Sequence, residues 1–330
     1  MITPEDIESF AHKPENHDAF AKCLAKILPH YTIFHWGGAP ATYKRHFMEW
    51  QKGEFTIYPN HYYSPIPDLT KLSDQDIERH SNMIGIKFDT AAMLKLVETF
   101  RKKYAGEYAI FNDAPPDESN RKFFFGNSAF GRVDAEILHC MVRHFSPKRF
   151  IEIGSGNSSM ITAAACELNR AEGRRTVFSL VEPYPNDLFF GAVPGITRLH
   201  EKDIREIPLA MFEELEAGDI LFIDSSHVIR CGNDVEYIYF EIIPRLRPGV
   251  MIHIHDIFLP RRYPIHWLKE EFIFWNEQYL VEAMLTHNPS YKVLWAGCHV
   301  HLKHPGKLKK AFPGYDPDVN CPGSLWIVRQ

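Results

Sequence analysis

The sequence predicts an α/β fold for residues 116–330, built on a mostly parallel sheet with helices on both faces. Two observations predict it. From residue 149 onward, short apolar runs alternate with helical patterns, and a glycine turn directly follows the first of these runs. Strands that alternate with helices form parallel sheets, because each crossover must return the chain before the next strand can pair. The 330 residues allow about two domains.

Seven apolar runs are expected to be strands, five before residue 256 and two late runs that close the sheet. They are residues 149–153, 176–181, 196–199, 219–223, 250–255, 291–296 and 324–328. Helices are expected between them near residues 158–170, 233–243 and 267–284. The second of these should stop at Pro244, because a proline ring interrupts helical hydrogen bonding.

Residues 1–115 predict a mainly helical N-terminal cap. Helical patterns occur at residues 14–28 and 91–104, on either side of an aromatic stretch whose two prolines exclude a regular helix, Pro65 and Pro67. The segment 115–120, Pro-Pro-Asp-Glu-Ser-Asn, has the composition of a hinge. We therefore expect a cap at residues 1–115 and a sheet domain at residues 116–330.

The composition excludes several classes of function. Hydrophobic residues make up 45% and charged residues 24%, and the net charge of −5 is too mild to indicate nucleic acid or an anionic membrane surface as partner. No run approaches the roughly 18 apolar residues of a membrane span, and the acidic start lacks signal-peptide features. The six cysteines lie far apart without a Cys-x-x-Cys pair. We expect a cytoplasmic protein with mostly buried, reduced cysteines and a small-molecule partner. The sequence leaves open whether the chain forms a homo-oligomer.

The strongest motif is the stretch 150–159, Phe-Ile-Glu-Ile-Gly-Ser-Gly-Asn-Ser-Ser. It reads as a buried strand, a Gly-x-Gly turn and a helix start, an arrangement that brings backbone close to a ligand at a helix N-terminus. A dinucleotide-binding fold would have a third glycine where this chain has Ser159. A nicotinamide-dependent oxidoreductase is therefore disfavoured.

Acidic residues follow the predicted strands, at the edge where open α/β sheets bind ligands. Glu182 follows the second strand, where a carboxylate can accept both hydroxyls of a ribose. Asp203, Asp224 and Asp256 follow the third, fourth and fifth strands. A single acid at such a position could equally well be a helix cap. It is much less expected that all of these acids would lie at the same sheet edge by chance.

With these motifs, the sequence resembles the class I S-adenosylmethionine-dependent methyltransferases, most closely the small-molecule branch with Asp-x-x-His after strand four, here Asp224 to His227. The resemblance covers about residues 123–330. It implies a Rossmann-like seven-stranded sheet of order 3-2-1-4-5-7-6 with the last strand antiparallel. It also implies that residues 154–156 wrap the methionine end of S-adenosyl-L-methionine, that Glu182 holds the ribose and that Asp203 lies beside the adenine. The residues expected at the cofactor are Glu152, Gly154, Ser155, Gly156, Asn157, Glu182, Asp203 and Asn127.

A second constellation joins Asp224 and His227 to His255 and Asp256 after the fifth strand. Adjacent strands lie about 4.8 Å apart, so these side chains can converge. Carboxylate and imidazole groups suit a divalent ion, and we expect Mg, Mn or Fe at Asp224, His255 and Asp256, where it would activate a hydroxyl toward a methyl group. His227 is the preferred general base, because histidine titrates near neutral pH; His255 and Asp224 are the other catalytic candidates.

Two segments could shape an acceptor pocket. Arg261 and Arg262 follow the fifth strand and could clamp a carboxylate or phosphate, although a solvated loop is equally expected. Tyr62 and Tyr63 offer aromatic faces to a substrate ring or a sulfonium cation, although an aromatic packing clasp is the alternative. We expect the tyrosines to cover the pocket as a lid.

Methylation of a small-molecule hydroxyl is the leading hypothesis, with an amine as second choice of acceptor. A metal-dependent hydrolase using His253, His255 and Asp256 is the alternative from another enzyme class. It is weaker because the later candidate ligands, His299 and His301, come only beyond the end of their strand. A non-catalytic cofactor-binding protein is the third hypothesis.

Overall fold

The computed structural model describes residues 3–31, 41–58, 60–114, 122–185 and 193–330. The chain divides into two units, Met1–Leu72 and Ser73–Gln330. The expected hinge at residues 115–120 lies outside the described residues. The boundary expected near residue 115 lies inside the second unit.

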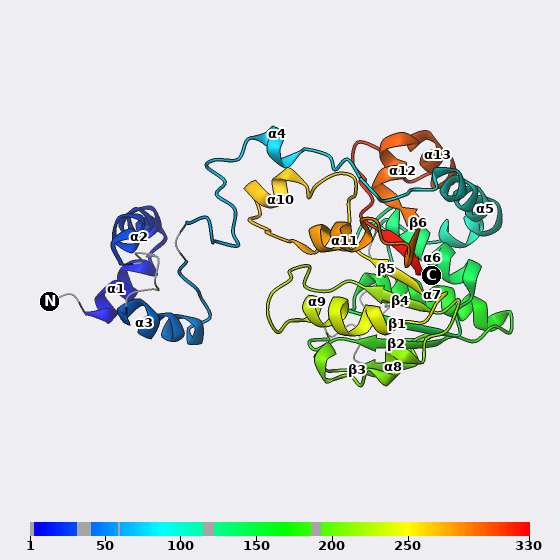
Figure 1. The fold of residues 1–330 in the computed structure, drawn as a ribbon, viewed down its shortest axis with the longest axis horizontal. Helices are drawn as coiled ribbons and strands as arrows, with labels where there is room; N and C mark the ends of the chain where they lie inside the picture. The colour runs from blue at the N-terminus through cyan, green and yellow to red at the C-terminus, as the bar shows by residue number, and fades with distance from the viewer. Residues whose placement is uncertain (1–2, 32–40, 59, 115–121, 186–192) are drawn as a thin grey trace. The chain divides into compact units, whose positions relative to one another are not determined.

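The first unit contains helices α1 (Pro4–Ala11), α2 (His17–Tyr31) and α3 (Ala41–Lys52) (Figure 1). α1 begins with a capping box, because the Thr3 hydroxyl accepts from the Asp6 backbone N–H while the Asp6 carboxylate accepts from that of Thr3. α2 coincides with the predicted helix at residues 14–28, extended at its C-terminal end and preceded by a short 3-10 turn, Pro14–Asn16.

The second unit contains one seven-stranded sheet, formed by the described residues in the order β3-β2-β1-β4-β5-β7-β6. β7 runs antiparallel to both of its neighbours, and the other pairs are parallel. The predicted order and the antiparallel last strand are confirmed. The strands are β1 (Arg149–Ile153), β2 (Val177–Val181), β3 (Arg198–His200), β4 (Ile220–Ile223), β5 (Met251–Ile254), β6 (Tyr291–Ala296) and β7 (Leu325–Arg329).

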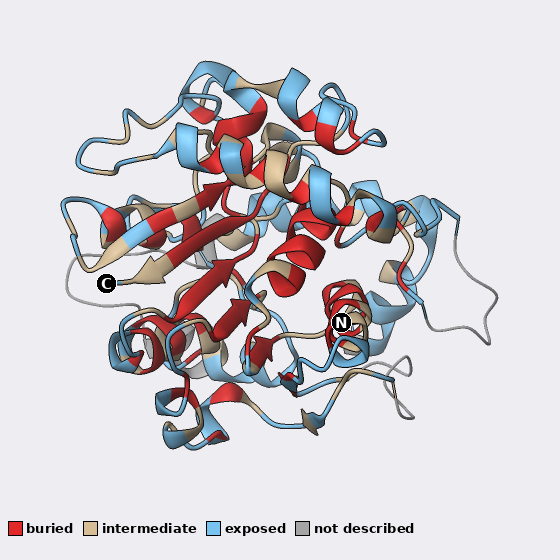
Figure 2. Cartoon of the chain, turned by 90° about the vertical axis from the view of Figure 1, so that its right-hand side faces the viewer, coloured by how far each residue is buried: buried red, intermediate tan, exposed pale blue. Residues whose placement is uncertain are grey.

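Helices cover both faces of this sheet. α7 (Asn157–Ala171) connects β1 to β2, and α9 (Asp234–Tyr237) connects β4 to β5. These crossovers lead in opposite directions from the sheet centre, so their common right-handedness places them on opposite faces. α6 (Asp134–Phe145) packs against α7 and α5 (Thr90–Tyr108), and α12 (Gly297–Lys303) and α13 (Pro305–Ala311) pack against α5. Figure 2 shows the buried strands between these layers. The remaining α-helices are α4 (Asp74–Ile77), α8 (Ala210–Glu213), α10 (Ile265–Lys269) and α11 (Glu277–Leu285).

α5 belongs to the core of the second unit. Its buried side chains recur every three or four residues, which is the spacing of one helix face. They are Met93, Val97, Phe100, Tyr104 and Tyr108. The helix predicted at residues 91–104 is therefore confirmed, and the residues before 115 contribute to packing around the sheet.

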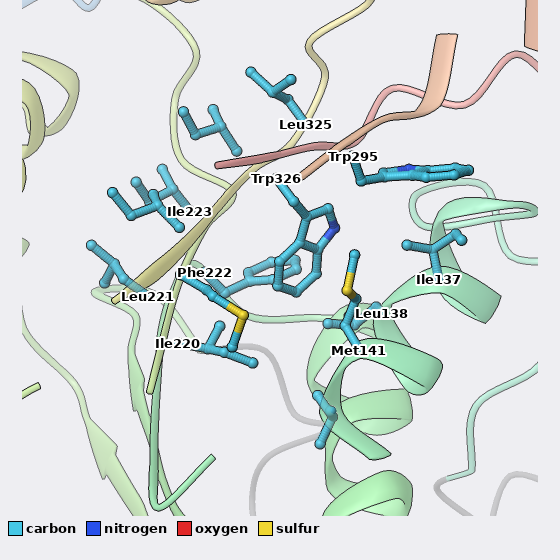
Figure 3. Packing of buried hydrophobic residues seen from close by; sticks show 14 of the residues in the cluster. Ile137, Leu138, Met141, Ile220, Leu221, Phe222, Ile223, Trp295, Leu325 and Trp326 are labelled. Atoms are coloured by element: carbon cyan, nitrogen blue, oxygen red, sulfur yellow. The ribbon is translucent and has the colours of Figure 1, made fainter. Parts of the chain in front are cut away.

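The core packs aromatic rings among aliphatic side chains (Figure 3). Phe222 of β4 and Trp326 of β7 pack toward α6, and both are fully buried. Between them lies the ring of His253, with centroids 4.0 Å from Phe222 and 4.9 Å from Trp326. Neither nitrogen of His253 has a hydrogen-bond partner among the described residues, and burial lowers its pKa well below the ordinary range. His253 is therefore a neutral core residue held by its ring contacts.

Two predicted helices differ in the structure. The helix expected at residues 267–284 is two helices, α10 and α11, because the backbone N–H groups of Asn276 and Glu277 donate to the carbonyl of His227 and fix the start of α11 there. The helix expected to stop at Pro244 leaves the α-helical pattern earlier. A π-helical turn, Ile238–Ile242, follows α9, and Pro244 lies inside a final 3-10 turn, Ile243–Arg245.

All six cysteines are free; Cys140, Cys166 and Cys298 are buried, Cys321 is half-buried, and Cys23 and Cys231 are exposed. Within the described part of the chain, no helix has the length and apolar character needed to cross a membrane.

Candidate active site

The turn after β1 packs directly on the end of β4. Gly154 has a φ of 88°, and a Cβ atom there would lie 1.9 Å from the carbonyl oxygen of Asp224. Only glycine allows this close approach. A Cβ atom on Gly156 would meet no heavy atom within 4 Å, so the turn is open on its other side.

Two serines hold the turn to the strand. The hydroxyls of Ser158 and Ser159 donate to Oε1 of Glu152 at 2.6 and 2.9 Å, and Ser159 also accepts from the Gly156 N–H at 3.1 Å. The serine in place of a third glycine therefore has a structural role. Burial raises the pKa of Glu152 to about 8, although both serine hydrogen bonds lower it, and Oε2 has no partner among the described residues. Glu152 is therefore protonated at neutral pH in the ligand-free chain, and a cationic ligand group held at this turn would favour its ionised form.

A cavity of about 440 Å³ opens beside this turn, at the ends of β1, β2 and β4. Three of the predicted acids line it together with Gly154, namely Glu182, Asp203 and Asp224. A larger cavity of about 650 Å³ lies between residues 85–89 and β6, but it contains none of the predicted site residues. The smaller cavity is therefore the candidate ligand site.

The acids in this cavity differ in what already occupies them. Glu182 accepts from the Tyr184 N–H at 2.8 Å through Oε1. Asp203 is held by Arg205 through two side-chain bonds of 2.8 Å, which lower its pKa. The adenine neighbour implied for Asp203 is thus a carboxylate already paired with a guanidinium. Sequence reasoning missed Ser225, which lines the cavity and whose buried hydroxyl has no partner among the described residues; its place directly after Asp224 was the available signal.

Five of the cofactor candidates do not line this cavity, namely Glu152, Ser155, Gly156, Asn157 and Asn127. Ser155 lies within the turn, and Asn157 is the first residue of α7. Asn127 uses all four of its hydrogen-bonding positions inside the turn 124–130: its NH₂ group donates to the carbonyls of Phe124 and Phe130, and its oxygen accepts from two backbone N–H groups.

His227 is surrounded by carboxylates. Its Nε2 lies 3.2 Å from Oδ1 of Asp224 and 3.7 Å from Oδ2 of Asp256, and its Nδ1 lies 2.9 Å from Oε2 of Glu277. Burial alone would lower the pKa of His227, but hydrogen bonds to Asp224 and Glu277 and the nearby charges raise it to about 10. His227 and Asp256 also have left-handed backbones, with φ of 58° and 53°. Strained residues of this kind concentrate where the surrounding structure holds a functional geometry.

The structure brings together Asp224, His227 and Asp256 as a group that could hold a metal ion. Each offers one ligand atom, and these atoms lie within 4.8 Å of one another. The predicted ligand set had His255 in place of His227. His255 instead lies against Phe130, at a centroid distance of 4.7 Å, and its Nε2 is 3.7 Å from the other oxygen of Asp256. His255 therefore lies beside the group, not within it.

The candidate substrate residues already have partners. Arg262 donates to Glu282 at 2.6 Å, and Arg261 donates to the sulfur of Cys321 at 3.6 Å. Tyr62 and Tyr63 belong to the first unit, where their rings lie 4.3 Å apart. The lid assignment for them stays a prediction.

Residues 151–257 match the family model described as a methyltransferase domain. The match runs from β1 to the residue after Asp256 and contains the glycine turn and the Asp224–His227 motif. The strand order is also the one that the methyltransferase resemblance implied. The chain carries a class I methyltransferase domain. It is an enzyme domain of the kind that uses S-adenosylmethionine.

Other proteins are similar to this methyltransferase domain or to the chain around it. An uncharacterized protein of Archaeoglobus fulgidus is 29% identical over 173 residues, which cover 49% of this chain and 75% of that protein. Among solved structures, an O-methyltransferase from Bacillus cereus in complex with SAH is 13% identical. The match covers 72% of this chain and 91% of that one, with a TM-score of 0.35; coverages below are given in the same order. A Mg–SAM complex of cmcI is 19% identical, with coverage of 54% and 73% and a TM-score of 0.31. CalS11, a TDP-rhamnose 3'-O-methyltransferase, is 13% identical, with coverage of 80% and 99% and a TM-score of 0.36.

Proposed function

We propose that the chain binds S-adenosylmethionine in the 440 Å³ cavity and methylates a hydroxyl of a small-molecule acceptor beside His227. One observation carries this proposal: Asp224 both lines the cavity and lies 3.2 Å from His227. Cofactor and acceptor would therefore meet at a single carboxylate.

The cavity residues suit the parts of this cofactor. Glu182 has a carboxylate at the end of β2, where it can accept the ribose hydroxyls. In the turn next to the cavity, the unpaired oxygen of an ionised Glu152 and the open side of Gly156 suit the cationic methionine end. The cofactor supplies an electrophilic methyl group on a sulfonium centre, and the carboxylates around the cavity favour that positive charge.

A divalent ion, Mg, Mn or Fe, is part of the proposal. Asp224, His227 and Asp256 would hold it, since two carboxylates and an imidazole within 4.8 Å are suitable ligands. Such an ion lowers the pKa of a bound hydroxyl and makes it a better nucleophile. Asp224 and Asp256 would orient the acceptor, and His227 would complete the ligand set of the ion.

His227 needs an unprotonated Nε2 in order to serve as general base. With a pKa near 10 it carries a proton at neutral pH and donates toward Asp224 and Asp256. A cation bound to these two carboxylates would favour loss of the Nε2 proton, because the cation and the proton compete for the same negative charge. Once deprotonated, Nε2 can either bind the ion or act as general base, so the two roles of His227 are alternative versions of the mechanism. The hydrolase alternative lacks one of its expected ligands, because His253 lies in the core between Phe222 and Trp326.

The first experiment is isothermal titration with S-adenosylmethionine, its demethylated product and NAD. We expect binding of the first two and none of NAD; binding of NAD alone would contradict the proposal. Incubation with a panel of hydroxylated and amino acceptors, followed by mass spectrometry, should then reveal a product heavier by one methyl group. Cofactor binding without any transfer over a broad panel would favour a non-catalytic binding protein.

A chelator separates the two versions of the mechanism. We expect EDTA to abolish transfer and Mg, Mn or Fe to restore it. Full activity in EDTA would remove the ion from the proposal and leave His227 acting alone. The cytoplasm is the proposed compartment, because a reducing environment suits a chain whose six cysteines are free.

A further inference from the structure

Glu277 is a fully buried acid at the first position of α11. Its two carboxylate oxygens contact different side chains. Oε2 lies 2.9 Å from Nδ1 of His227, and Oε1 accepts from the hydroxyl of Tyr239 at 2.8 Å. A buried carboxylate is stable only where it is hydrogen-bonded or paired, and each oxygen here has one such partner.

The backbone beside Glu277 holds the same histidine. The N–H groups of Asn276 and Glu277 donate to the carbonyl of His227 at 3.0 and 3.1 Å. The side chain of Asn276 accepts from the N–H of Ile229 at 2.6 Å. The start of α11 therefore fixes the loop around His227, whose φ of 58° needs such support.

The imidazole ring is thereby fixed as well as the backbone. The indole of Trp275 lies 4.2 Å from the His227 ring, centroid to centroid. Glu277 occupies Nδ1, so Nε2 is the nitrogen that faces Asp224 and Asp256. When one ring nitrogen of a histidine donates to a carboxylate, the orientation of the ring is fixed. The direction in which the other nitrogen points is then fixed as well.

We propose that Glu277, itself held by Tyr239, is the positioning residue that keeps a hydrogen on Nδ1 of His227 and directs Nε2 into the methyl-transfer site. The role of Nε2 rests on the proposed function; the positioning itself does not. Tyr239 completes the arrangement because its hydroxyl donates to the oxygen of Glu277 that the histidine leaves free. Burial and the charge of Glu277 raise the pKa of Tyr239 well above its usual range, so this hydroxyl stays a donor.

A purely structural role for Glu277 would not require a carboxylate. Two main-chain hydrogen bonds already anchor α11 on the His227 carbonyl, and an apolar side chain of similar length could fill the space of Glu277. A carboxylate that contacts Nδ1 instead keeps the hydrogen on that nitrogen, also when Nε2 loses its proton. Only the second role predicts an effect on the imidazole hydrogen itself.

The test uses the full chain labelled with ¹⁵N-histidine, and His227→Asn assigns the His227 signals. We expect the wild-type Nδ1–H to be protected from solvent exchange. Glu277→Met should speed that exchange by about tenfold or more, because it removes the charge-assisted hydrogen bond that holds the Nδ1–H. Glu277→Gln keeps an acceptor oxygen and should retain most of the protection. Glu282→Met, on the same helix but bonded to Arg262, is the matched control and should leave the His227 signals unchanged.

Unchanged Nδ1–H protection in folded Glu277→Met would overturn the proposal. If that variant does not fold, Tyr239→Phe decides. It should weaken the protection severalfold, and no change there would equally reject the positioning role. In transfer assays, Glu277→Met should lower kcat while the dissociation constant of S-adenosylmethionine stays unchanged, because Glu277 does not line the cavity. The NMR result needs neither cofactor nor acceptor, so a wild-type chain without transferase activity would reject the proposed function and leave this result standing.

Discussion

Negative charge dominates the site at the scale of single residues. Asp224, Asp256 and Glu277 surround the imidazole of His227. Ionised, these three carboxylates carry more negative charge than a protonated His227 can balance. Burial raises the pKa of Asp256, whereas the neighbouring histidines outweigh burial and lower that of Asp224. A group of buried and partly buried acids with fewer cationic partners than carboxylates favours a further cation. A sulfonium centre and a divalent ion are both cations of this kind.

Glu182 offers the most direct test of the cofactor site. We expect Glu182→Ala to weaken S-adenosylmethionine binding by at least about tenfold, because a carboxylate lost from two ribose hydroxyls forfeits roughly 1.5–3 kcal/mol. Titration calorimetry measures the dissociation constant. Glu201→Ala is the control, since Glu201 is exposed and does not line the cavity. An unchanged constant in folded Glu182→Ala would remove the ribose from this carboxylate.

Elements position these residues, and the turn between β1 and α7 shows how. Gly154 faces the carbonyl of Asp224, while Gly156 faces open space. The two glycines of one motif therefore differ: Gly154 is required for close packing, whereas Gly156 has space beside it. Sequence could predict the turn and its neighbouring strands, because apolar runs and glycine spacing are local signals. It could not predict the break between α10 and α11, which depends on hydrogen bonds to the distant carbonyl of His227.

The two glycines should respond differently to alanine. Gly154→Ala should lower the free energy of unfolding by at least about 1–3 kcal/mol, because φ is 88° and the added Cβ would overlap the Asp224 carbonyl oxygen. Gly156→Ala should unfold like the wild type, since its φ of 166° is extended backbone, but should bind S-adenosylmethionine more weakly. Urea unfolding and calorimetry provide the two measurements. Equal stabilities for the two variants would contradict this division of roles.

The contact between α5 and α6 depends on an ion pair. Glu107 accepts from Arg143 at 2.8 and 2.9 Å and lies 2.9 Å from Nε2 of His139. Burial raises the pKa of Glu107, but the bonds to His139 and Arg143 outweigh it and lower the value to about 2. A carboxyl whose folded pKa lies below its unfolded pKa of about 4.3 stabilises the fold above that value and loses this contribution as the pH falls toward 2.

Glu107→Gln should therefore destabilise the protein at neutral pH by up to about 3 kcal/mol. The stability difference from wild type should shrink as the pH falls from about 5 toward 2, because protonation removes the same charge from the wild type. Urea unfolding of both proteins across this range measures it. Glu98→Gln is the control, since its partner Arg101 lies on the same helix and the pair is more exposed. A pH-independent difference would show that the charge of Glu107 does not stabilise this contact.

At the scale of the whole molecule, the sheet and the metal-capable group were predictable to different degrees. The strand order followed from a resemblance that the glycine turn and the acids at strand ends supported, and the sheet confirms it. Which histidine joins Asp224 and Asp256 was not predictable. Both His227 and His255 lie at strand ends, and only the left-handed backbone of His227 and its bond to Glu277 direct its ring between the two carboxylates. Glu277 itself lies 50 residues from His227 and had no local signal.

The division into two units leads to the last prediction. Every residue that lines the proposed cofactor cavity belongs to Ser73–Gln330, whereas Tyr62 and Tyr63 belong to Met1–Leu72. If these tyrosines form the proposed lid, their loss should admit water and misplace the acceptor without changing the cavity lining. We expect Tyr62→Ala/Tyr63→Ala to keep the wild-type dissociation constant for S-adenosylmethionine and to lower methyl transfer by about tenfold or more, with a higher KM for the acceptor. Tyr58→Ala, in the same unit, is the control. Unchanged transfer in a folded double variant would make the two rings a packing clasp, and the acceptor specificity would then belong to the sheet unit alone.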